Sequence, residues 1–146
     1  MREKSMPLVA HLVDGQTVTG SSDRRQDILN PATGQVTGAV ALASKATVEE
    51  AIAAAQAAFP KWRDTPPGKR ARILNRFRQL LEENAERISA LVTQEHGKVL
   101  GDARGELARG IENVEYACGV PELLKGEHSK NVGPGIDSWS EFQPLG

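Results

Sequence analysis

The sequence predicts an α/β chain in which short strands come first, about four helices follow and a β-hairpin comes last. Three observations predict this order. Turn residues separate short β-prone runs in the first 43 residues, and apolar residues then recur at steps of three and four up to about residue 125. Near the end, two further β-prone runs flank Gly133-Pro134-Gly135.

Four short strands are expected before the first helix, over residues 8–43. An Asp-Gly pair at 14–15 lies between two β-prone runs within His11–Thr19, and this is a strong hairpin signal. Two further strands are expected at Gln26–Asn30 and Gln35–Ala43, because a Pro-Ala-Thr-Gly turn separates them.

The first two helices are each expected to begin at a threonine. A capping box starts at Thr47, and the alanine-rich helix that follows should stop at Pro60. Thr65 is expected to cap the second helix, with Pro66 at its first position and an end near Glu83. The residues expected to face inward in these two helices are Ala51, Ile52, Ala55, Ala58, Phe59, Leu74, Phe77, Leu80 and Leu81.

A third helix is predicted over Ala85–His96. Asn84 is a plausible N-cap, and Gly97 follows the last helical residue, where glycine commonly ends a helix. Ile88, Leu91 and Val92 should face inward. A single bent helix over residues 66–96 is the alternative.

The fourth helix, Lys98–Cys118, has an apolar stripe interrupted by glycines. The stripe consists of Leu100, Ala103, Leu107, Ile111, Val114 and Cys118. Gly101, Gly105 and Gly110 each cost a helix about 1 kcal/mol relative to alanine, so another backbone is expected to approach the Gly101–Gly105 side closely. Pro121 should kink or end this helix.

The last strands are expected at Glu127–Val132 and Ile136–Gln143, after Gly126 has ended the helical segment. The Gly-Pro-Gly turn between them predicts a hairpin.

Composition indicates a cytoplasmic chain. The net charge of −1 gives no overall attraction to nucleic acid or to an anionic membrane. The single Cys118 excludes an internal disulfide and fits a reducing compartment. Met1–Lys4 is charged without a following apolar h-region, and no apolar run approaches the ~20 residues that span a bilayer.

Few residues suggest a catalytic or ligand-binding role. Cys118 lies near a helix C-terminus on the apolar stripe, where the helix dipole disfavours a thiolate, so a structural role is favoured. His11, His96 and His128 have no metal-ligand spacing, and no metal site is predicted. The sequence contains neither G-x-G-x-x-G nor a P-loop, so no nucleotide site is visible.

The most suggestive patch is the basic face at 61–83. Seven Lys/Arg against three acids give this segment a net charge of +4, and Lys69, Arg72 and Arg76 share one helical stripe. Such a stripe can follow phosphates, but aromatic interleaving is absent, so a solvated helix face is the simpler interpretation.

Several stretches together resemble the N-terminal part of the aldehyde dehydrogenase superfamily. They are Asn30-Pro31-Ala32-Thr33-Gly34, the alanine-rich helix running into Phe59 and Trp62, Arg70–Leu74 and Glu95–Lys98. Residues 106–127 with 135–146 more closely resemble one branch, the CoA-acylating methylmalonate-semialdehyde dehydrogenases. Phe142 departs from that branch, because many members carry a basic residue there.

The resemblance implies an enzyme of which this chain is about the first third. Such enzymes oxidise malonate or methylmalonate semialdehyde with NAD and CoA to acetyl-CoA or propionyl-CoA, releasing carbon dioxide. Their catalytic cysteine and NAD contacts lie downstream of the matched segment, so no catalytic or cofactor-binding residue is carried onto this chain. The fragment alone is expected to be inactive and to bind neither NAD nor CoA.

The resemblance also implies a domain assignment. Residues 1–126 would belong to the coenzyme-binding domain, whose doubly wound sheet lies outside this chain. Residues 127–146 would be a truncated hairpin of the oligomerisation domain, joining a homotetramer through 127–143. The aldehyde substrate would bind through the missing domains. The alternatives are another aldehyde dehydrogenase branch, a small helical binding module using the basic face at 61–83, and a marginally folded truncated product.

Overall fold

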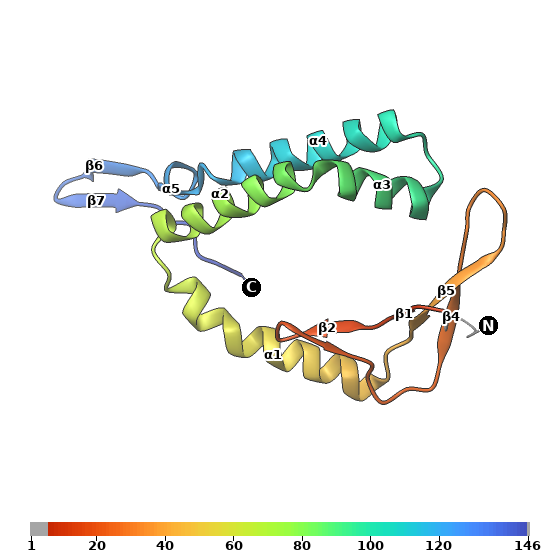
Figure 1. Cartoon of the computed structure of the whole chain (residues 1–146). Coiled ribbons are helices and arrows are strands. Elements are labelled where there is room, and N and C mark those ends of the chain that lie inside the picture. Colours follow the sequence, from red (N-terminus) through yellow and green to blue (C-terminus); the bar gives the residue numbers. More distant parts are fainter. Residues whose placement is uncertain (1–5, 146) are drawn as a thin grey trace. The chain divides into compact units, whose positions relative to one another are not determined.

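The computed structural model describes residues 6–145, which form seven strands and five helices (Figure 1). They divide into two compact units. The first runs to Trp62 and takes in 90–100, and the second consists of 63–89 and the chain from Gly101 on. The predicted α/β class, with strands first, helices next and a hairpin last, is confirmed.

Five strands, rather than the four expected, lie in the first unit. They are β1 (Leu8–Val9), β2 (His11–Val13), β3 (Gln16–Val18), β4 (Arg25–Leu29) and β5 (Val36–Ala41). β1 was not predicted because two residues are too few to show a period. It pairs in parallel with β5, which pairs antiparallel with β4 on its other side, so the three-stranded sheet has the order β1-β5-β4.

The predicted hairpin at the Asp-Gly pair is confirmed. β2 and β3 pair antiparallel, with Val13 opposite Gln16 next to the turn. The two turn residues, Asp14 and Gly15, have φ of 49° and 71°. Two successive residues with positive φ are the requirement of a type I′ turn, which matches the twist of a hairpin.

Helix α1 (Lys45–Arg63) begins earlier and ends later than predicted. The capping residue is Ser44 and not Thr47, because the Ser44 Oγ accepts the backbone N–H of Thr47 at 3.2 Å. Thr47 is buried in the first turn, with its hydroxyl 3.0 Å from the Ser44 Oγ. Pro60 does not stop the helix. A proline removes one helical hydrogen bond, and this long helix continues for three residues past it.

Helix α2 (Pro67–Glu83) starts one residue later than predicted. Pro66 occupies the N-cap position without a side-chain cap, and Pro67 takes the first helical position, so the prediction of Thr65 as cap was wrong. A proline at the first helical position costs the helix no hydrogen bond, because the N–H that it lacks would have no helical partner.

A break between α2 and α3 (Ala85–His96) is confirmed at Asn84. The predicted side-chain cap is wrong, however, because the Asn84 Nδ2 donates back to the Leu80 carbonyl at 2.8 Å and closes α2. Gly97 ends α3 as predicted, with φ of 84° and its N–H donating to the Thr93 carbonyl at 2.8 Å. A Cβ there would lie 3.1 Å from Pro31, so the Pro-Ala-Thr-Gly turn packs on this glycine.

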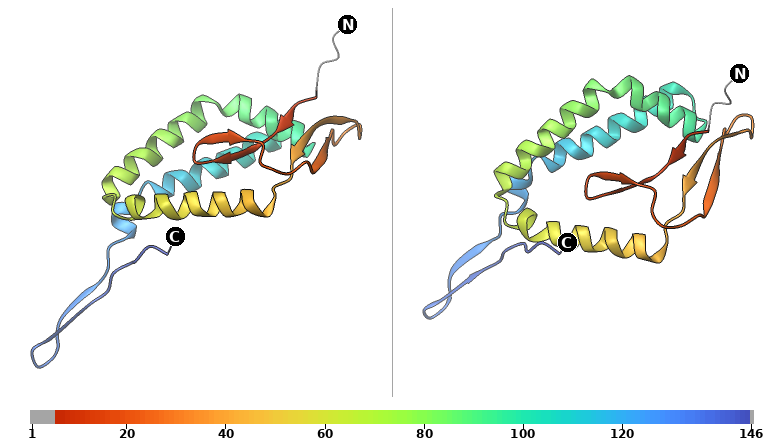
Figure 2. Two further views of the ribbon diagram at one scale, coloured as in Figure 1. Left: turned by 90° about the horizontal axis from the view of Figure 1, so that it is seen from below. Right: turned by 60° about the horizontal axis from the view of Figure 1, so that its bottom comes forward.

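Helix α4 (Leu100–Ala117) is somewhat shorter than predicted, and two ion pairs fix its direction within the second unit. Arg104 binds both carboxylate oxygens of Glu86 at 2.6 and 3.1 Å, and Arg78 lies 3.8 Å from Glu115. α4 therefore runs antiparallel to α2 and the start of α3, as Figures 1 and 2 show.

The apolar stripe of α4 is confirmed over most of its length. Ala103 is fully buried, Leu100 is exposed, and the residues that are half-buried are Leu107, Ile111, Val114 and Cys118. The expected backbone approach to its glycines is not found among the described residues, since none lies within 4 Å of a Cβ built on Gly101 or Gly110.

After α5 (Val120–Leu123), with Pro121 in its single turn, the chain forms the predicted hairpin. Its strands are β6 (His128–Gly133) and β7 (Ile136–Trp139), so the second strand ends four residues earlier than expected. At the base of the hairpin, the Ser140 N–H donates to the Glu127 carbonyl at 2.9 Å, and the Ser140 Oγ accepts the Glu127 N–H at 2.9 Å.

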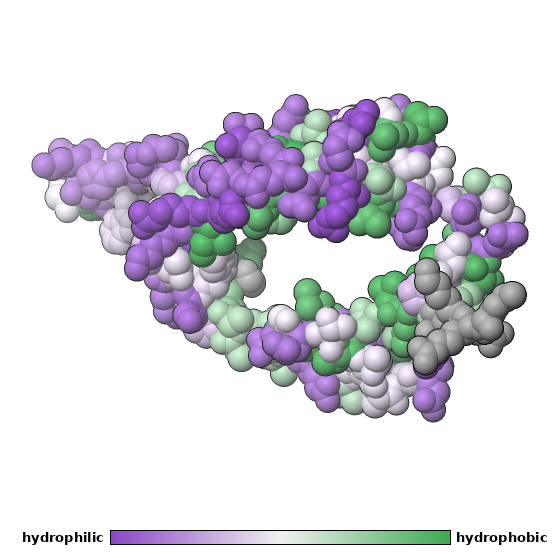
Figure 3. All heavy atoms as spheres, in the orientation of Figure 1, coloured by the Kyte–Doolittle hydropathy of each residue, from purple (hydrophilic) through white to green (hydrophobic). Residues whose placement is uncertain are grey.

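The core of the described residues contains no large side chain. The buried side chains are those of Ala41, Thr47, Ala71, Ser89 and Ala103. Several residues of the first three helices that were predicted to face inward are exposed instead, and hydrophobic residues are visible at the surface (Figure 3): Ile52, Ala55, Ala58, Phe77, Leu80 and Leu91. Helical periodicity identified these faces as apolar correctly, but no other described element covers them.

Replacing Ser89 by alanine is expected to stabilise the chain by about 1 kcal/mol. Ser89 is fully buried, and its Oγ has no hydrogen-bond partner among the described residues, so removing the hydroxyl removes a desolvation penalty. The urea midpoint of unfolding measures the effect. Ser138→Ala, at an exposed position of β7, is the matched control and should leave the midpoint unchanged. A lower midpoint for Ser89→Ala would contradict the expectation.

Candidate functional site

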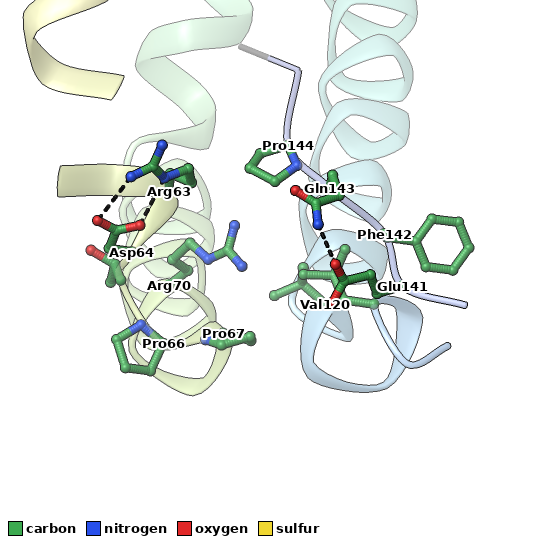
Figure 4. Close-up of a pocket in the computed structure, with 12 residues that line it drawn as sticks. Arg63, Asp64, Pro66, Pro67, Arg70, Val120, Glu141, Phe142, Gln143 and Pro144 are labelled. Atoms are coloured by element: carbon green, nitrogen blue, oxygen red, sulfur yellow. Dashed lines mark hydrogen bonds and ion pairs between the residues drawn. The ribbon is translucent and has the colours of Figure 1, made fainter. Parts of the chain in front are cut away.

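A cavity of about 520 Å³ in the second unit is lined by several charged side chains (Figure 4). Its lining residues come from the end of α1 and the start of α2, from α5 and the residue after it, and from the segment after β7: Arg63, Asp64, Thr65, Pro66, Pro67, Arg70, Val120, Leu124, Glu141, Phe142, Gln143 and Pro144. The cavity thus joins segments more than seventy residues apart, which local sequence patterns do not reveal.

The charges around this cavity are largely paired. The Arg63 Nε and Nη2 donate to the two Asp64 oxygens at 2.7 and 3.2 Å. This hydrogen bonding, with the charge of Arg63, holds the pKa of Asp64 below its usual value and raises the pKa of Arg63. On the opposite side, the Gln143 amide donates to Glu141.

Arg70 is the second arginine that lines this cavity, besides Arg63. Figure 4 shows its side chain extending into the space between the Arg63–Asp64 pair and the 141–144 segment. Its Nε is buried and has no hydrogen-bond partner among the described residues. Neither a histidine nor a cysteine is among the residues that line this cavity.

Cys118 lies directly after the end of α4. It is half-buried, and its Sγ donates to the Val114 carbonyl at 3.3 Å. This hydrogen bond holds the thiol against its own helix, which agrees with a structural role.

The three histidines are not brought together. His11 is half-buried in β2, with an Nε2 that has no hydrogen-bond partner among the described residues, whereas His96 and His128 are exposed on α3 and β6. The described part of the chain contains no cluster of three or more His, Cys, Asp or Glu that could hold a metal ion.

In the basic face at 61–83, each of the three acids forms an ion pair with an arginine. Arg76 contacts Glu83 at 3.2 Å and Arg78 contacts Glu82 at 3.1 Å, while the third acid, Asp64, is taken by Arg63. The net charge of +4 already counts these acids, and within the stripe of Lys69, Arg72 and Arg76 the ion pair engages Arg76, which fits the solvated helix face favoured from the sequence.

Two apolar hollows were not predicted, because Ile52, Phe77 and Leu80, which line them, were expected to face inward. One, of about 390 Å³, lies on α2 among Arg72, Ile73, Arg76, Phe77 and Leu80. The other, of about 460 Å³, lies in the first unit between the β2–β3 hairpin and α1, and its lining includes Leu12, Val48 and Ile52. Among the described helices, none combines the length and the apolar character that crossing a bilayer requires.

Comparison with protein families gives one match that covers most of the chain. The model of the aldehyde dehydrogenase family matches residues 18–146.

Curated relatives share high identity over nearly the whole chain. The malonate-semialdehyde dehydrogenase of Pseudomonas aeruginosa is 58% identical over 141 residues, which are 97% of this chain and 28% of the relative. The acylating, mitochondrial methylmalonate-semialdehyde/malonate-semialdehyde dehydrogenase of Rattus norvegicus is 43% identical over 142 residues, 97% of this chain and 26% of the relative. The chain therefore spans little more than a quarter of the length of these relatives.

Solved structures agree with this result. The methylmalonate-semialdehyde dehydrogenase of Oceanimonas doudoroffii superimposes with a TM-score of 0.91 at 62% identity, over 95% of this chain and 28% of that one. A protein of Sinorhizobium meliloti described as a methylmalonate-semialdehyde dehydrogenase, solved in complex with NAD, gives a TM-score of 0.93 at 44% identity, over 99% and 29% of the two chains.

Proposed function

The chain belongs to the aldehyde dehydrogenase family, and from this premise we propose that it is the N-terminal part of an NAD-dependent, CoA-acylating (methyl)malonate-semialdehyde dehydrogenase. The observation that carries the proposal is the 58% identity to the Pseudomonas aeruginosa malonate-semialdehyde dehydrogenase over 97% of this chain. The rat relative is named as acylating, and the Sinorhizobium meliloti neighbour was solved with NAD, which supports both co-substrates.

In the proposed reaction, a malonate or methylmalonate semialdehyde is oxidised to acetyl-CoA or propionyl-CoA with loss of carbon dioxide. NAD accepts the hydride, and the CoA thiol accepts the acyl group. We infer that NAD binds outside these residues, because the sequence has no glycine-rich phosphate loop.

We infer that the catalytic and cofactor-binding residues lie outside these 146 residues. The placement of Cys118 supports this, because it is half-buried and donates to a carbonyl of its own helix, whereas a nucleophilic thiolate needs an electropositive and accessible site. The role of this chain is then architectural: it supplies helices and strands on which the rest of the enzyme packs.

We propose that residues 1–126 belong to the coenzyme-binding domain and 127–146 to the oligomerisation domain. The hairpin is suited to pairing with another subunit, because every residue of β6 and β7 except Gly133 is exposed and Trp139 presents its side chain to solvent. A homotetramer formed through residues 127–143 and a cytoplasmic location complete the proposal. The paired charges at 61–83 do not favour nucleic acid as a partner.

A chimeric enzyme tests the proposed function. Residues 1–146 of this chain replace the matching segment of the Pseudomonas aeruginosa malonate-semialdehyde dehydrogenase, and reduction of NAD is followed with malonate semialdehyde and CoA. We expect CoA-dependent turnover within about tenfold of the parent enzyme, equivalent to ~1.4 kcal/mol of barrier, and no turnover by the 146-residue chain alone.

The control is a chimera that carries the corresponding segment of the Corynebacterium glutamicum benzaldehyde dehydrogenase, which is only 32% identical to this chain. It should assemble less well. A folded chimera of this chain without CoA-dependent NAD reduction would refute the proposed function, and turnover by the chain alone would show that catalytic residues lie within it.

A further inference from the structure

We propose that the cavity beside Arg70 is a binding site for a small oxyanion, either a carboxylate or inorganic phosphate. We call this cavity of about 520 Å³ the Arg70 cavity. All of its lining residues belong to the second unit, so the site is independent of the proposed dehydrogenase reaction.

Arg70 brings a positive charge to the cavity, and its Nε has no acceptor among the described residues. This atom is buried, and the side chain extends into the space between the Arg63–Asp64 pair and the 141–144 segment (Figure 4). A buried donor without an acceptor is costly, and more so when the group is charged. An oxyanion in the cavity removes this cost, because a guanidinium can donate two parallel hydrogen bonds to a carboxylate or a phosphate.

The two acids that line the cavity are already engaged by other side chains. Both carboxylate oxygens of Asp64 accept hydrogen bonds from Arg63, at 2.7 and 3.2 Å. Glu141 accepts a hydrogen bond from the amide of Gln143. The Nε of Arg70 donates to neither acid. Arg63 is thus neutralised by its neighbour, and the charge of Arg70 remains for a ligand.

The start of helix α2 adds to the attraction for an anion. Thr65, Pro66, Pro67 and Arg70 line the cavity, so the N-terminal end of this 17-residue helix borders it. The first turn contains no acidic residue, and Pro66 at the N-cap provides no side-chain hydrogen bond. The positive end of the helix dipole therefore acts on the same space as the guanidinium of Arg70.

The volume and the walls of the cavity fit a small ligand. Ligand pockets commonly have volumes of about 300–1,000 Å³, a range that includes this cavity. Val120, Leu124, Phe142 and Pro144 contribute apolar walls. Because apolar walls lower the local dielectric constant, they strengthen the attraction between the guanidinium and an anion.

Glu141 is expected to limit the affinity. Its carboxylate lies on the wall opposite Arg70 and repels an anion (Figure 4). Replacing Glu141 by glutamine should therefore strengthen binding, whereas replacing Arg70 by glutamine should weaken it. This pair of opposite effects is specific to an anion site, because a substitution that only disrupts the cavity weakens binding.

The experiment titrates the 146-residue chain with inorganic phosphate and, separately, with acetate, at constant ionic strength in calorimetry. We expect saturable binding that Arg70→Gln weakens at least tenfold and Glu141→Gln strengthens several-fold. Arg72→Gln is the matched control and should leave the affinity unchanged, because Arg72 is exposed on the same helix and does not line the cavity. The anion that binds more tightly identifies the ligand group as phosphate or carboxylate.

In parallel, the NMR signal of the Arg70 Nε–H should shift on addition of the anion, which locates the site even if Arg70→Gln fails to fold. Absence of saturable binding, or equal affinities of the Arg70→Gln and Arg72→Gln variants, would overturn the proposal. Loss of binding in the chimera would also overturn it, by showing that the rest of the enzyme supplies the acceptor for Arg70. Binding is measured without the aldehyde, so failure here leaves the proposed function untouched.

Discussion

Replacing Ala103 by aspartate is expected to abolish the fold of the second unit. Ala103 has no exposed surface, and it lies on α4 where this helix runs beside α3, next to the Arg104–Glu86 ion pair. A carboxylate placed there would be buried, and Arg104 is already engaged by Glu86 through two hydrogen bonds. Burial of an unpaired charge costs several kcal/mol, which is comparable with the ~5–15 kcal/mol stability of a whole domain.

Hydrogen exchange of the α4 amides, together with far-UV circular dichroism, measures this effect. The amides of residues 100–117 should lose their protection in Ala103→Asp. The matched control is Ala108→Asp, which introduces the same group on the same helix at an exposed position and should keep protection close to that of the unaltered chain. Equal protection in the two variants would show that α4 is not packed through Ala103.

Replacing Gly126 by alanine is expected to open the base of the hairpin. An added Cβ would fall on the carbonyl oxygen of Ser140 and 2.6 Å from its carbon. These are backbone atoms, so no side-chain rotation relieves the clash, and the two hydrogen bonds between Glu127 and Ser140 must break. Overpacking of this kind costs about 1–3 kcal/mol or more. A two-stranded hairpin is only marginally stable, so this cost is enough to open its base.

Exchange of the Ser140 amide and the fluorescence of Trp139 report on this base. We expect the Ser140 amide to exchange at the rate of an unprotected peptide in Gly126→Ala. Gly68→Ala is the control, since no atom lies within 4 Å of the Cβ it adds to the first turn of α2. Retained protection at Ser140 in Gly126→Ala would mean that the two strands approach less closely than the structure shows.

Local signals were sufficient to predict the hairpin turn at 14–15, the bounds of α3 and the end at Gly97, because each depends on a few neighbouring residues. They failed where two neighbouring residues can each serve as the N-cap of the same helix. Ser44 and Thr47 are three residues apart and either can cap a helix, so the choice depends on which hydroxyl becomes buried, and Thr47 is the buried one.

Exposure was the property that the sequence predicted least well. Periodicity shows that Phe77 and Leu80 form an apolar face, but it does not show whether their partner lies within the same chain. The polar cavity was unpredictable for a related reason, because Arg70 and Gln143 meet only after the helices have packed. That no catalytic group lies in this chain is still a prediction, based on a family resemblance and not on a local pattern.

The small size of the buried side chains has a consequence for synthesis on the ribosome. If the chain is the first part of a dehydrogenase of the length of its Pseudomonas aeruginosa relative, about 360 residues are still to be translated when residue 146 has been added. At ~5–20 residues per second, this takes on the order of tens of seconds. During that interval the nascent segment carries apolar helical faces without cover, which makes it a natural substrate for chaperones that bind emerging polypeptides.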